Sequence, residues 1–230
     1  MTGKPFVHIV GVEPEGIDPG RAPLCEYLPK TALVIGGKRH LESLRGVLPD
    51  EVESLAVTAN IPDVVARLLR FIKEENGDKK ALVLATGDPL YYGIGAPIAA
   101  ALPAGSFSVH PATTLVQRSF ALLGEPWDKV SVGSLHSKKE SPKLHPGRWA
   151  FYTGGISGVR EVCSLVLEKG FAIRKMSILE EIGMAGERVR HFEAVEGINR
   201  LPDDVKALNM VVMTIEERVG RITPRQPGGS

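Results

Sequence analysis

The chain contains few cysteines, few aromatic residues and no long apolar run. Its 230 residues include two cysteines, Cys25 and Cys163, and only 6% are Phe, Trp or Tyr. Two cysteines cannot make a disulfide framework and lack metal-ligand spacing, so we expect buried, reduced thiols, no metal site and a cytoplasmic protein. No stretch approaches the roughly 18 consecutive apolar residues of a membrane span. We therefore expect no membrane segment.

The chain also lacks an excess of charge of either sign. It has 28 Lys and Arg against 27 Asp and Glu, a formal net charge of +1. The whole-molecule field therefore gives no general attraction to nucleic acid or to an acidic membrane. By contrast, its 25 glycines and 17 prolines indicate many tight connections. Such connections are typical of α/β enzymes, and the length suits one or two domains.

Short β-branched runs alternate with helical periodicity in the first half. The continuous apolar run Ala81–Ala85 suits a parallel strand that is covered on both faces. The order of strands and helices favours an α/β fold with a mainly parallel sheet. The predicted strands are 6–10, 32–35, 54–57, 81–85 and 106–109, and the predicted helices are 61–76 and 113–123.

The second half predicts a different sheet. Its predicted strands are 130–132, 149–152, 176–179, 187–192 and 210–214, with a helix at 159–169. Gly183–Gly186 joins two consecutive strands as a hairpin, which requires a mixed sheet. We therefore predict an N-terminal α/β domain at 1–111, a C-terminal α/β domain at 112–222 and a disordered tail at 223–230.

Common nucleotide and hydrolase motifs are missing. In the first turn, Glu13 replaces the second glycine of the dinucleotide fingerprint, and no acid follows the strand that ends at Ile35. This disfavours an NAD-dependent dehydrogenase. A P-loop, a nucleophile elbow and a Cys–His pair are also missing from the sequence. The histidines at 8, 40, 110 and 191 lack the spacing of a metal helix, so we interpret them as packing or surface residues.

The segment after the strand at 81–85 is a candidate binding loop. It reads Thr86-Gly87-Asp88-Pro89-Leu90-Tyr91-Tyr92-Gly93 and lies where open α/β folds bind ligands. A simple structural interpretation is that Asp88 caps the next helix and Pro89 occupies its first position. A functional interpretation is that the glycines let a ligand approach the backbone. Both interpretations stay open on the residues alone.

A cationic loop lies between Ser134 and Arg148. Its four cations, Lys138, Lys139, Lys143 and Arg148, outnumber its single acid, Glu140, and it also contains His136 and His145. Such a loop suits an acidic substrate, although lysines on a loop are also commonly just solvated. Arg118, Arg188 and Arg190 either enlarge this patch or make surface ion pairs.

Several motifs occur in a collinear order over about 200 residues and together resemble the tetrapyrrole methylase family. The strongest resemblance is to the group of precorrin and cobalt-precorrin-7 C5-methyltransferases (the E-type subunit) of cobalamin biosynthesis, whose Gly-Gly-x-Arg-His-Leu segment appears at 36–41. The other motifs are the segment 86–93, His110-Pro111-Ala112-Thr113-Thr114, Leu123-Gly124-Glu125-Pro126-Trp127, Ser134-Leu135-His136, Glu181-Ile182-Gly183 with Glu187-Arg188-Val189, and Leu208-Asn209.

The resemblance implies a two-domain fold, a homodimer, and S-adenosylmethionine bound between the domains as methyl donor, with S-adenosylhomocysteine as product. The substrate would be a late precorrin or cobalt-precorrin, methylated at C5. His136 is the candidate catalytic base. The implied cofactor contacts are Pro14, Thr86, Gly87, Asp88, Tyr91, Thr114, Leu115, Thr153 and Ala185, and the implied substrate contacts are Arg118, His136, Lys138 and Arg188.

Two departures from the family pattern and several alternatives accompany this interpretation. The usual glycine-rich first turn is Glu13-Pro14-Glu15 here. Lys138 stands where the family has an arginine, and a lysine cannot bind a carboxylate through two parallel hydrogen bonds as an arginine does. Larger relatives carry a fused C15 methyltransferase and decarboxylase domain, so we expect a separate subunit for that step. The alternatives are uroporphyrinogen, diphthine or ribosomal RNA ribose methylation, or a non-catalytic tetrapyrrole carrier.

Overall fold

The structure is a computed structural model that describes residues 6–58, 60–74, 77–135, 142–195 and 201–218. The chain forms two compact units, Met1–Arg118 (unit 1) and Ser119–Ser230 (unit 2). This division falls inside a helix, whereas the sequence suggested a boundary at Pro111. The predicted tail at 223–230 lies outside the described residues. Within the described ranges, no helix is long and apolar enough to cross a membrane.

Unit 1 contains a five-stranded sheet with the order β3-β2-β4-β1-β5. All four pairings between neighbouring strands are parallel, which confirms the predicted parallel α/β sheet. The central strand β4 is buried on both faces, as its unbroken apolar sequence predicts. The strands are β1 (Val7–Val12), β2 (Thr31–Gly36), β3 (Glu53–Ala56), β4 (Lys80–Thr86) and β5 (Phe107–His110).

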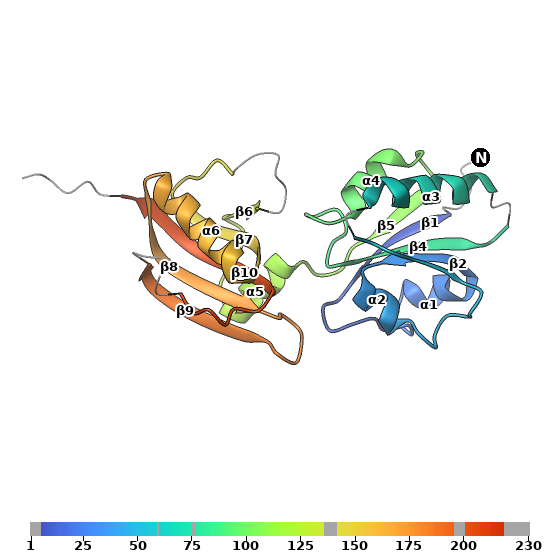
Figure 1. Ribbon diagram of the computed structural model, residues 1–230, viewed down its shortest axis with the longest axis horizontal. Coiled ribbons are helices and arrows are strands. Elements are labelled where there is room, and N and C mark those ends of the chain that lie inside the picture. The colour runs from blue at the N-terminus through green and yellow to red at the C-terminus, as the bar shows by residue number, and fades with distance from the viewer. Residues whose placement is uncertain (1–5, 59, 75–76, 136–141, 196–200, 219–230) are drawn as a thin grey trace, which may run out of the picture. The chain divides into compact units, whose positions relative to one another are not determined.

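Helices cover both faces of this sheet (Figure 1). On one face, α3 (Ile61–Glu74) and α4 (Gly95–Ala101) pack over the alternate β1 residues Val7 and Ile9. On the other face, α1 (Leu24–Tyr27) packs over Val10 and Val12, together with Leu28 and Leu44. Because successive strand side chains point to opposite faces, one strand supplies both cores. The short helices α1, η1 (Leu28–Lys30) and α2 (Lys38–Ser43) were not predicted, since segments of three to six residues show no helical periodicity.

Unit 2 contains a second five-stranded sheet with the order β6-β7-β10-β8-β9. The β6–β7 pair is parallel and the other three pairs are antiparallel, which confirms the predicted mixed sheet. The consecutive strands β8 and β9 form the predicted hairpin around Gly183–Gly186. The strands are β6 (Val130–Ser134), β7 (Gly147–Gly154), β8 (Phe171–Glu180), β9 (Arg188–Val195) and β10 (Leu208–Glu217).

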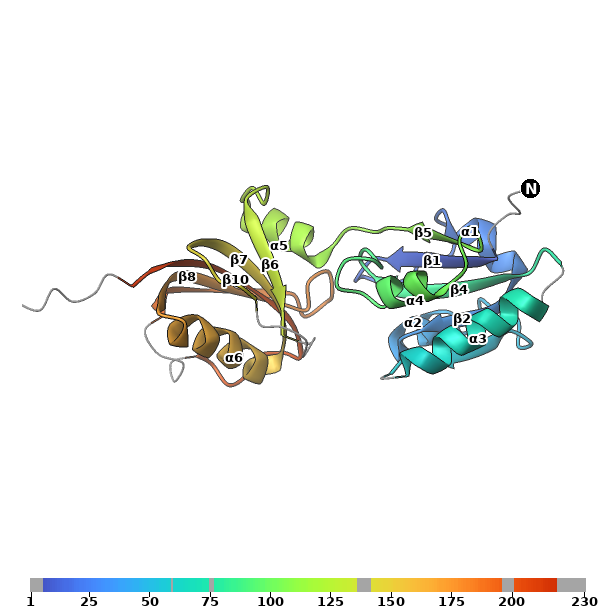
Figure 2. The same cartoon turned by 90° about the horizontal axis from the view of Figure 1, so that it is seen from above.

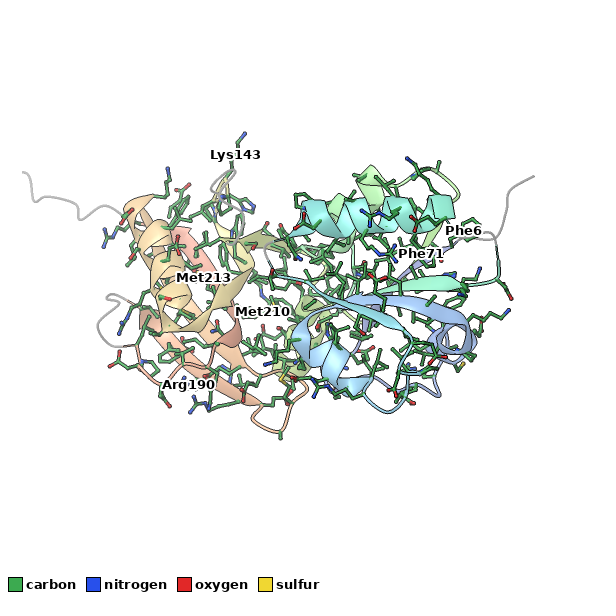
Figure 3. All side chains as sticks on the ribbon, turned by 45° about the vertical axis from the view of Figure 1, so that its right-hand side comes forward. Phe6, Phe71, Lys143, Arg190, Met210 and Met213 are labelled. Carbon is green, nitrogen blue, oxygen red and sulfur yellow. The ribbon has the colours of Figure 1, made fainter. Side chains whose placement is uncertain are left out.

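The sheet of unit 2 also lies between helices (Figure 2). Helix α6 (Gly155–Glu168) covers one face and packs in the cluster that includes Met213 of β10. The residues of α5 (Leu115–Leu123) that belong to unit 2 cover the opposite face, where the Ser119 hydroxyl lies 3.5 Å from the sulfur of Met210. Figure 3 labels both methionines on β10.

Cys163 of α6 is buried as predicted, whereas Cys25 is exposed, so the prediction of two buried thiols was wrong for Cys25.

A buried histidine lies on β1 at the face that α1 covers. The His8 ring stacks on Tyr27 with 3.6 Å between ring centroids, and its Nδ1 lies 2.7 Å from the Ser108 hydroxyl. Ser108 in turn contacts Nε2 of His110 at 2.8 Å. Burial lowers the pKa of His8 to about 4, and the nearby His110 and Lys80 act in the same direction. Of the two roles that the sequence left open for His8, packing or surface, the structure shows packing.

This buried imidazole predicts a pH dependence of stability. Because the pKa of His8 is about 4 in the folded chain and 6.5 ordinarily, the unfolded chain binds its proton first as the pH falls. As the pH falls from 6.5 to about 4, we expect His8 to lower the free energy of unfolding by up to about 1.4 kcal/mol per pH unit. Urea unfolding of the wild type and of His8→Phe, which keeps a ring on Tyr27, measures this. Equal pH slopes for both proteins would contradict the prediction.

Candidate functional site

Three loops of unit 1 meet where the parallel strands β4, β1 and β5 end. They are residues 13–16 after β1, 87–94 after β4 and 111–114 after β5, and we call them together the loop edge. Main-chain hydrogen bonds connect them. The Gly87 N–H donates to the Val12 carbonyl at 2.9 Å, and the Ala112 N–H donates to the Gly87 carbonyl at 3.4 Å. The loop edge is thus one connected structure at the position where such sheets bind ligands.

The close approach of these loops depends on Gly11. A Cβ atom at Gly11 would lie 2.2 Å from the Gly87 carbonyl oxygen and 2.5 Å from the Ala112 nitrogen. Contacts this short are sterically forbidden, and both partners are main-chain atoms that cannot rotate away. Only glycine therefore allows β1 to pass between the neighbouring loops at this point.

Gly87 connects the loops in a second way. Its φ of +73° lies in the region that favours glycine, and a Cβ atom there would lie 3.3 Å from the Thr113 carbonyl oxygen. The residue is buried, and its N–H and C=O both bond to neighbouring loops. In this structure Gly87 therefore serves loop packing.

Polar side chains come from Thr86 at the end of β4 and from Asp88 and Tyr91 of the loop edge. The Thr86 hydroxyl lies 3.1 Å from Nη2 of Arg39 and 3.0 Å from Nε2 of His40. Asp88 Oδ1 accepts a hydrogen bond from the Leu90 N–H at 2.9 Å, inside its own loop. Because Ile94, not Asp88, occupies the N-cap position of α4, the interpretation of Asp88 as a helix cap was wrong.

Tyr91 and Tyr92 add aromatic surface to the loop edge. Their rings meet edge to face with 5.1 Å between centroids, and 37% of Tyr91 and 55% of Tyr92 are exposed. Partial burial raises the pKa of the Tyr91 phenol, with Tyr92 acting in the same direction, so the Tyr91 hydroxyl stays protonated near neutral pH. An exposed aromatic pair in the same loop as Asp88 offers a surface for a flat or cationic ligand.

Thr114 and Leu115 open helix α5. The Thr114 hydroxyl accepts a hydrogen bond from the Gln117 N–H at 3.1 Å, and Gln117 Oε1 accepts one from the Thr114 N–H at 3.0 Å. This reciprocal pair is a capping box, which explains why the helix begins at Leu115 rather than at Thr113. Both predicted cofactor contacts thus lie next to Thr113, whose carbonyl faces Gly87.

Both carboxylates of the acidic first turn pair with one arginine inside unit 1. Pro14 is buried in a turn closed by a 3.1 Å hydrogen bond from the Gly16 N–H to the Glu13 carbonyl. Arg118 donates to Glu13 from Nε at 3.2 Å and from Nη2 at 2.8 Å, and it also binds Glu15. Burial tends to raise the pKa of Glu13, but hydrogen bonds from Arg118 and Thr113 outweigh burial, so the pKa falls below its ordinary value. Arg118 is therefore occupied by this turn.

A pocket of about 610 Å³ lies beside the first turn within unit 1. Its lining combines the apolar Leu24 with Glu13, Arg118 and Arg21. Sequence reasoning missed Arg21, because a single arginine in a Gly- and Pro-rich loop carries no pattern. The predicted cofactor contacts Thr86, Gly87, Asp88, Tyr91, Thr114 and Leu115 do not line this pocket.

In unit 2, Thr153 lies near the end of β7 and Ala185 in the β8–β9 hairpin. The Thr153 hydroxyl is buried and donates to the side-chain oxygen of Asn209, whose Nδ2 donates to the Lys206 carbonyl at 2.6 Å. Asn209 therefore fixes Thr153. Asn209 belongs to one of the motifs of the family resemblance, but the sequence predicted no role for it.

Arg188 and Arg190 bind a buried carboxylate (Figure 3 labels Arg190). Glu180 has no exposed surface, and it accepts hydrogen bonds from both arginines and from the Lys206 N–H at 2.8 Å. Burial tends to raise the pKa of Glu180, but Arg188 and the Lys206 N–H outweigh it and lower the pKa. Both arginines also pair with Asp204. Of the two roles that the sequence left open for them, the structure shows ion pairing.

The cationic loop is described only in part. His136 and Lys138 lie outside the described residues, so their predicted roles stay predictions. Arg148 pairs with Glu125 and stacks over the Phe120 ring at 4.8 Å, while His145 Nε2 lies 2.9 Å from the Ser131 hydroxyl. Arg148 is thus held within unit 2 by a carboxylate and an aromatic ring.

Comparison with known proteins gives the family. The model of the tetrapyrrole (corrin/porphyrin) methylases matches residues 25–196, which is most of the chain. The chain belongs to this family. Most of the motifs that carried the resemblance, including Thr86-Gly87-Asp88 and Glu181-Ile182-Gly183, fall within the matched range, whereas Leu208-Asn209 lies beyond it.

Two curated relatives and one solved structure support the assignment. A cobalt-precorrin-7 C(5)-methyltransferase of Salmonella typhimurium is 28% identical over 193 residues, which cover 83% of this chain and 92% of the relative. A precorrin-6Y C(5,15)-methyltransferase (decarboxylating) of a Sinorhizobium species is 26% identical over 192 residues, which cover 81% of this chain but only 44% of the relative. The chain thus spans less than half of this longer relative.

The solved structure is the uroporphyrin-III C-methyltransferase from Thermus thermophilus complexed with S-adenosylhomocysteine. It matches this chain with a TM-score of 0.69 at 18% sequence identity, and the match covers 92% of this chain and 97% of that chain. Identity this low shows a shared fold. The two-domain tetrapyrrole methylase fold expected from the sequence is therefore confirmed.

The first site prediction concerns Gly11. We expect Gly11→Ala to lower the free energy of unfolding by about 2 kcal/mol, because the added methyl group overlaps main-chain atoms of two loops. Gly37→Ala is the matched control, since a Cβ atom there meets nothing closer than 3.8 Å. Urea unfolding measures both variants. Equal stability of the two variants would show that the loops separate without cost.

The second site prediction concerns Glu180. We expect Glu180→Ala to lower the free energy of unfolding by about 3 kcal/mol, because it leaves two guanidinium groups and the Lys206 N–H without their buried acceptor. Glu216→Ala is the control, because Glu216 makes a 3.6 Å ion pair with Arg174 and both side chains are more than half exposed. Thermal unfolding of both variants decides. A loss at Glu180 no larger than at Glu216 would contradict the prediction.

Proposed function

We propose that this chain transfers a methyl group from S-adenosylmethionine to C5 of a late precorrin or cobalt-precorrin in cobalamin biosynthesis. The observation that carries the proposal is the relative named cobalt-precorrin-7 C(5)-methyltransferase, which aligns with this chain over 92% of its own length. The family match over residues 25–196 supports the same class of reaction. A relative named as a precorrin-6Y C(5,15)-methyltransferase (decarboxylating), matched over 44% of its own length, supports the same class of reaction.

The chemistry of the loop edge fits S-adenosylmethionine. That ligand carries hydrogen-bond donors in its ammonium, ribose and adenine groups, together with a positive sulfonium. Thr86 at the end of β4 and Asp88 in the loop after it supply acceptor oxygens, and Tyr91 supplies a partly exposed aromatic ring. We therefore infer that these three side chains make cofactor contacts, whereas Gly87 and Thr114 shape the loops around them.

The bound cofactor supplies an activated methyl group, so the chain needs no nucleophile of its own. The protein has to bind both reactants, align them and exclude water. In the transfer, the C5–methyl bond forms with electrons of the macrocycle while the sulfur–methyl bond breaks, and its electron pair stays on sulfur. A proton must then leave the macrocycle. His136 is the proposed base for it, because an imidazole exchanges protons near neutral pH.

The substrate carries several carboxylates, and the chain's cations are the groups that would bind them. Arg118 and Arg188 already hold Glu13, Glu15, Glu180 and Asp204. We therefore propose that they shape the first turn and the end of β8, and that any contact with the substrate requires them to share their donors. His136 and Lys138 remain the proposed direct contacts. We also infer that the protein works as a cytoplasmic homodimer.

The test is binding followed by turnover. We expect isothermal calorimetry to show micromolar binding of S-adenosylhomocysteine, and incubation with S-adenosylmethionine and a precorrin-7 substrate, metal-free or with cobalt, to add one methyl group to the macrocycle by mass spectrometry. A non-catalytic carrier would bind the macrocycle and leave its mass unchanged. Cofactor binding undetectable at millimolar concentration would reject the proposal.

A further inference from the structure

The loop after β4 exposes three large apolar side chains in succession. Leu90, Tyr91 and Tyr92 are 48%, 37% and 55% exposed, and they are three of the seven exposed large apolar residues in the part of the chain that the structure describes. Exposed apolar residues that are scattered singly need no explanation, whereas adjacent ones mark a surface where ligands or partners bind. The function proposed above uses only Tyr91 of the three.

The loop that carries these residues is tightly folded. The Gly95 N–H donates to the carbonyl of the buried Pro89 at 3.0 Å, and the Tyr91 N–H donates to the Asp88 carbonyl at 3.1 Å. A Cβ atom at Gly93 would lie 2.6 Å from the same Pro89 oxygen, so the chain turns back directly over Pro89. The side chains at 90–92 are therefore held on a preformed turn.

Tyr92 has a backbone conformation that its side chain disfavours. Its φ is +54°, in the left-handed region where a Cβ atom crowds the main chain, so a tyrosine costs free energy there that a glycine would not. Because 55% of Tyr92 stays exposed, burial of the ring offsets only part of this cost. Strained residues of this kind cluster at ligand sites, so the strain indicates a function for the exposed ring.

The two tyrosine rings cannot both stack on one flat ligand. Their planes are 90° apart with 5.1 Å between centroids, so the edge of one ring meets the face of the other. A flat group that stacks on one ring can therefore meet the other ring only at its edge. Methyl transfer brings two ligands together, and each contains flat rings, the adenine of the cofactor and the pyrrole rings of the macrocycle. The tyrosine pair suits both ligands, with one ring for each.

We propose that Tyr92 contacts the tetrapyrrole substrate, with its ring packed on a pyrrole ring of the macrocycle, while Tyr91 stays a cofactor contact. The inference rests on the function proposed above and adds to it a residue that binds the apolar body of the substrate, whereas the proposed cations bind its carboxylates. Tyr92 takes the larger ligand because it is the more exposed of the two tyrosines, and the exposed Leu90 adds apolar surface in the same loop.

Binding of the macrocycle tests the proposal. The visible absorption of a precorrin-7 substrate, metal-free or with cobalt, reports its binding under anaerobic conditions, and saturating S-adenosylhomocysteine prevents turnover. We expect Tyr92→Ala to weaken this binding about tenfold because it removes the aromatic contact, and Tyr92→Phe to stay within about twofold of the wild type because it keeps the ring. Calorimetry should show that Tyr92→Ala leaves the affinity for S-adenosylhomocysteine unchanged.

A glycine at the same position separates the ring from the strain. Tyr92→Gly removes the ring as Tyr92→Ala does, but it accepts a positive φ. We expect the thermal unfolding midpoint of Tyr92→Gly to exceed that of Tyr92→Ala by about 2–4 °C, and the loss of macrocycle affinity to be the same in both. Affinity would then follow the ring and not the stability of the loop. Equal midpoints would show that Tyr92 is not strained and would overturn the inference.

A matched control and the remaining outcomes complete the test. Val47→Ala changes another exposed apolar residue, 44% exposed and outside the loop edge, and it should leave both affinities unchanged. An unchanged macrocycle affinity of Tyr92→Ala, an equal loss in Tyr92→Phe, or a loss confined to the cofactor would overturn this inference alone. Absence of macrocycle binding by the wild type would instead reject the proposed function and this inference with it.

Discussion

The close approach of β1 to the two loops beside it is the constraint on which the candidate site depends. Gly11 lies so near the Gly87 carbonyl and the Ala112 nitrogen that no side chain fits between them. Because of this contact, the ends of β4, β1 and β5 form one connected edge rather than three separate loops. The side chains of Thr86, Asp88 and Tyr91 are positioned by that edge, so a local backbone contact sets the geometry of the proposed cofactor contacts.

The sequence predicted most of the sheets, because burial on both faces leaves a strong signal. The run Ala81–Ala85 suits a strand covered on both faces, and all five of its residues are buried in β4. Gly183–Gly186 likewise predicted the β8–β9 hairpin and the mixed sheet. The short helices α1 and α2 could not be predicted in the same way, since their formation depends on packing against β1, β2 and β4 rather than on a local pattern.

The candidate site was predicted in location but not in detail. Strand order placed the segment 86–93 at the carboxyl edge of the sheet, where the structure has it. Which groups face outward could not be inferred, because it depends on contacts between distant loops. Gly87 uses both of its main-chain groups within unit 1, and Arg118 binds Glu13 across 105 residues.

The most direct test of this account is hydrogen–deuterium exchange of the full chain with and without S-adenosylhomocysteine. If the loop edge holds the cofactor, the ligand should slow exchange of amides in residues 86–94 and 112–115, with little change in the outer helix α3. Slowed exchange that leaves both segments unaffected, and instead appears only around the pocket beside the first turn, would contradict it.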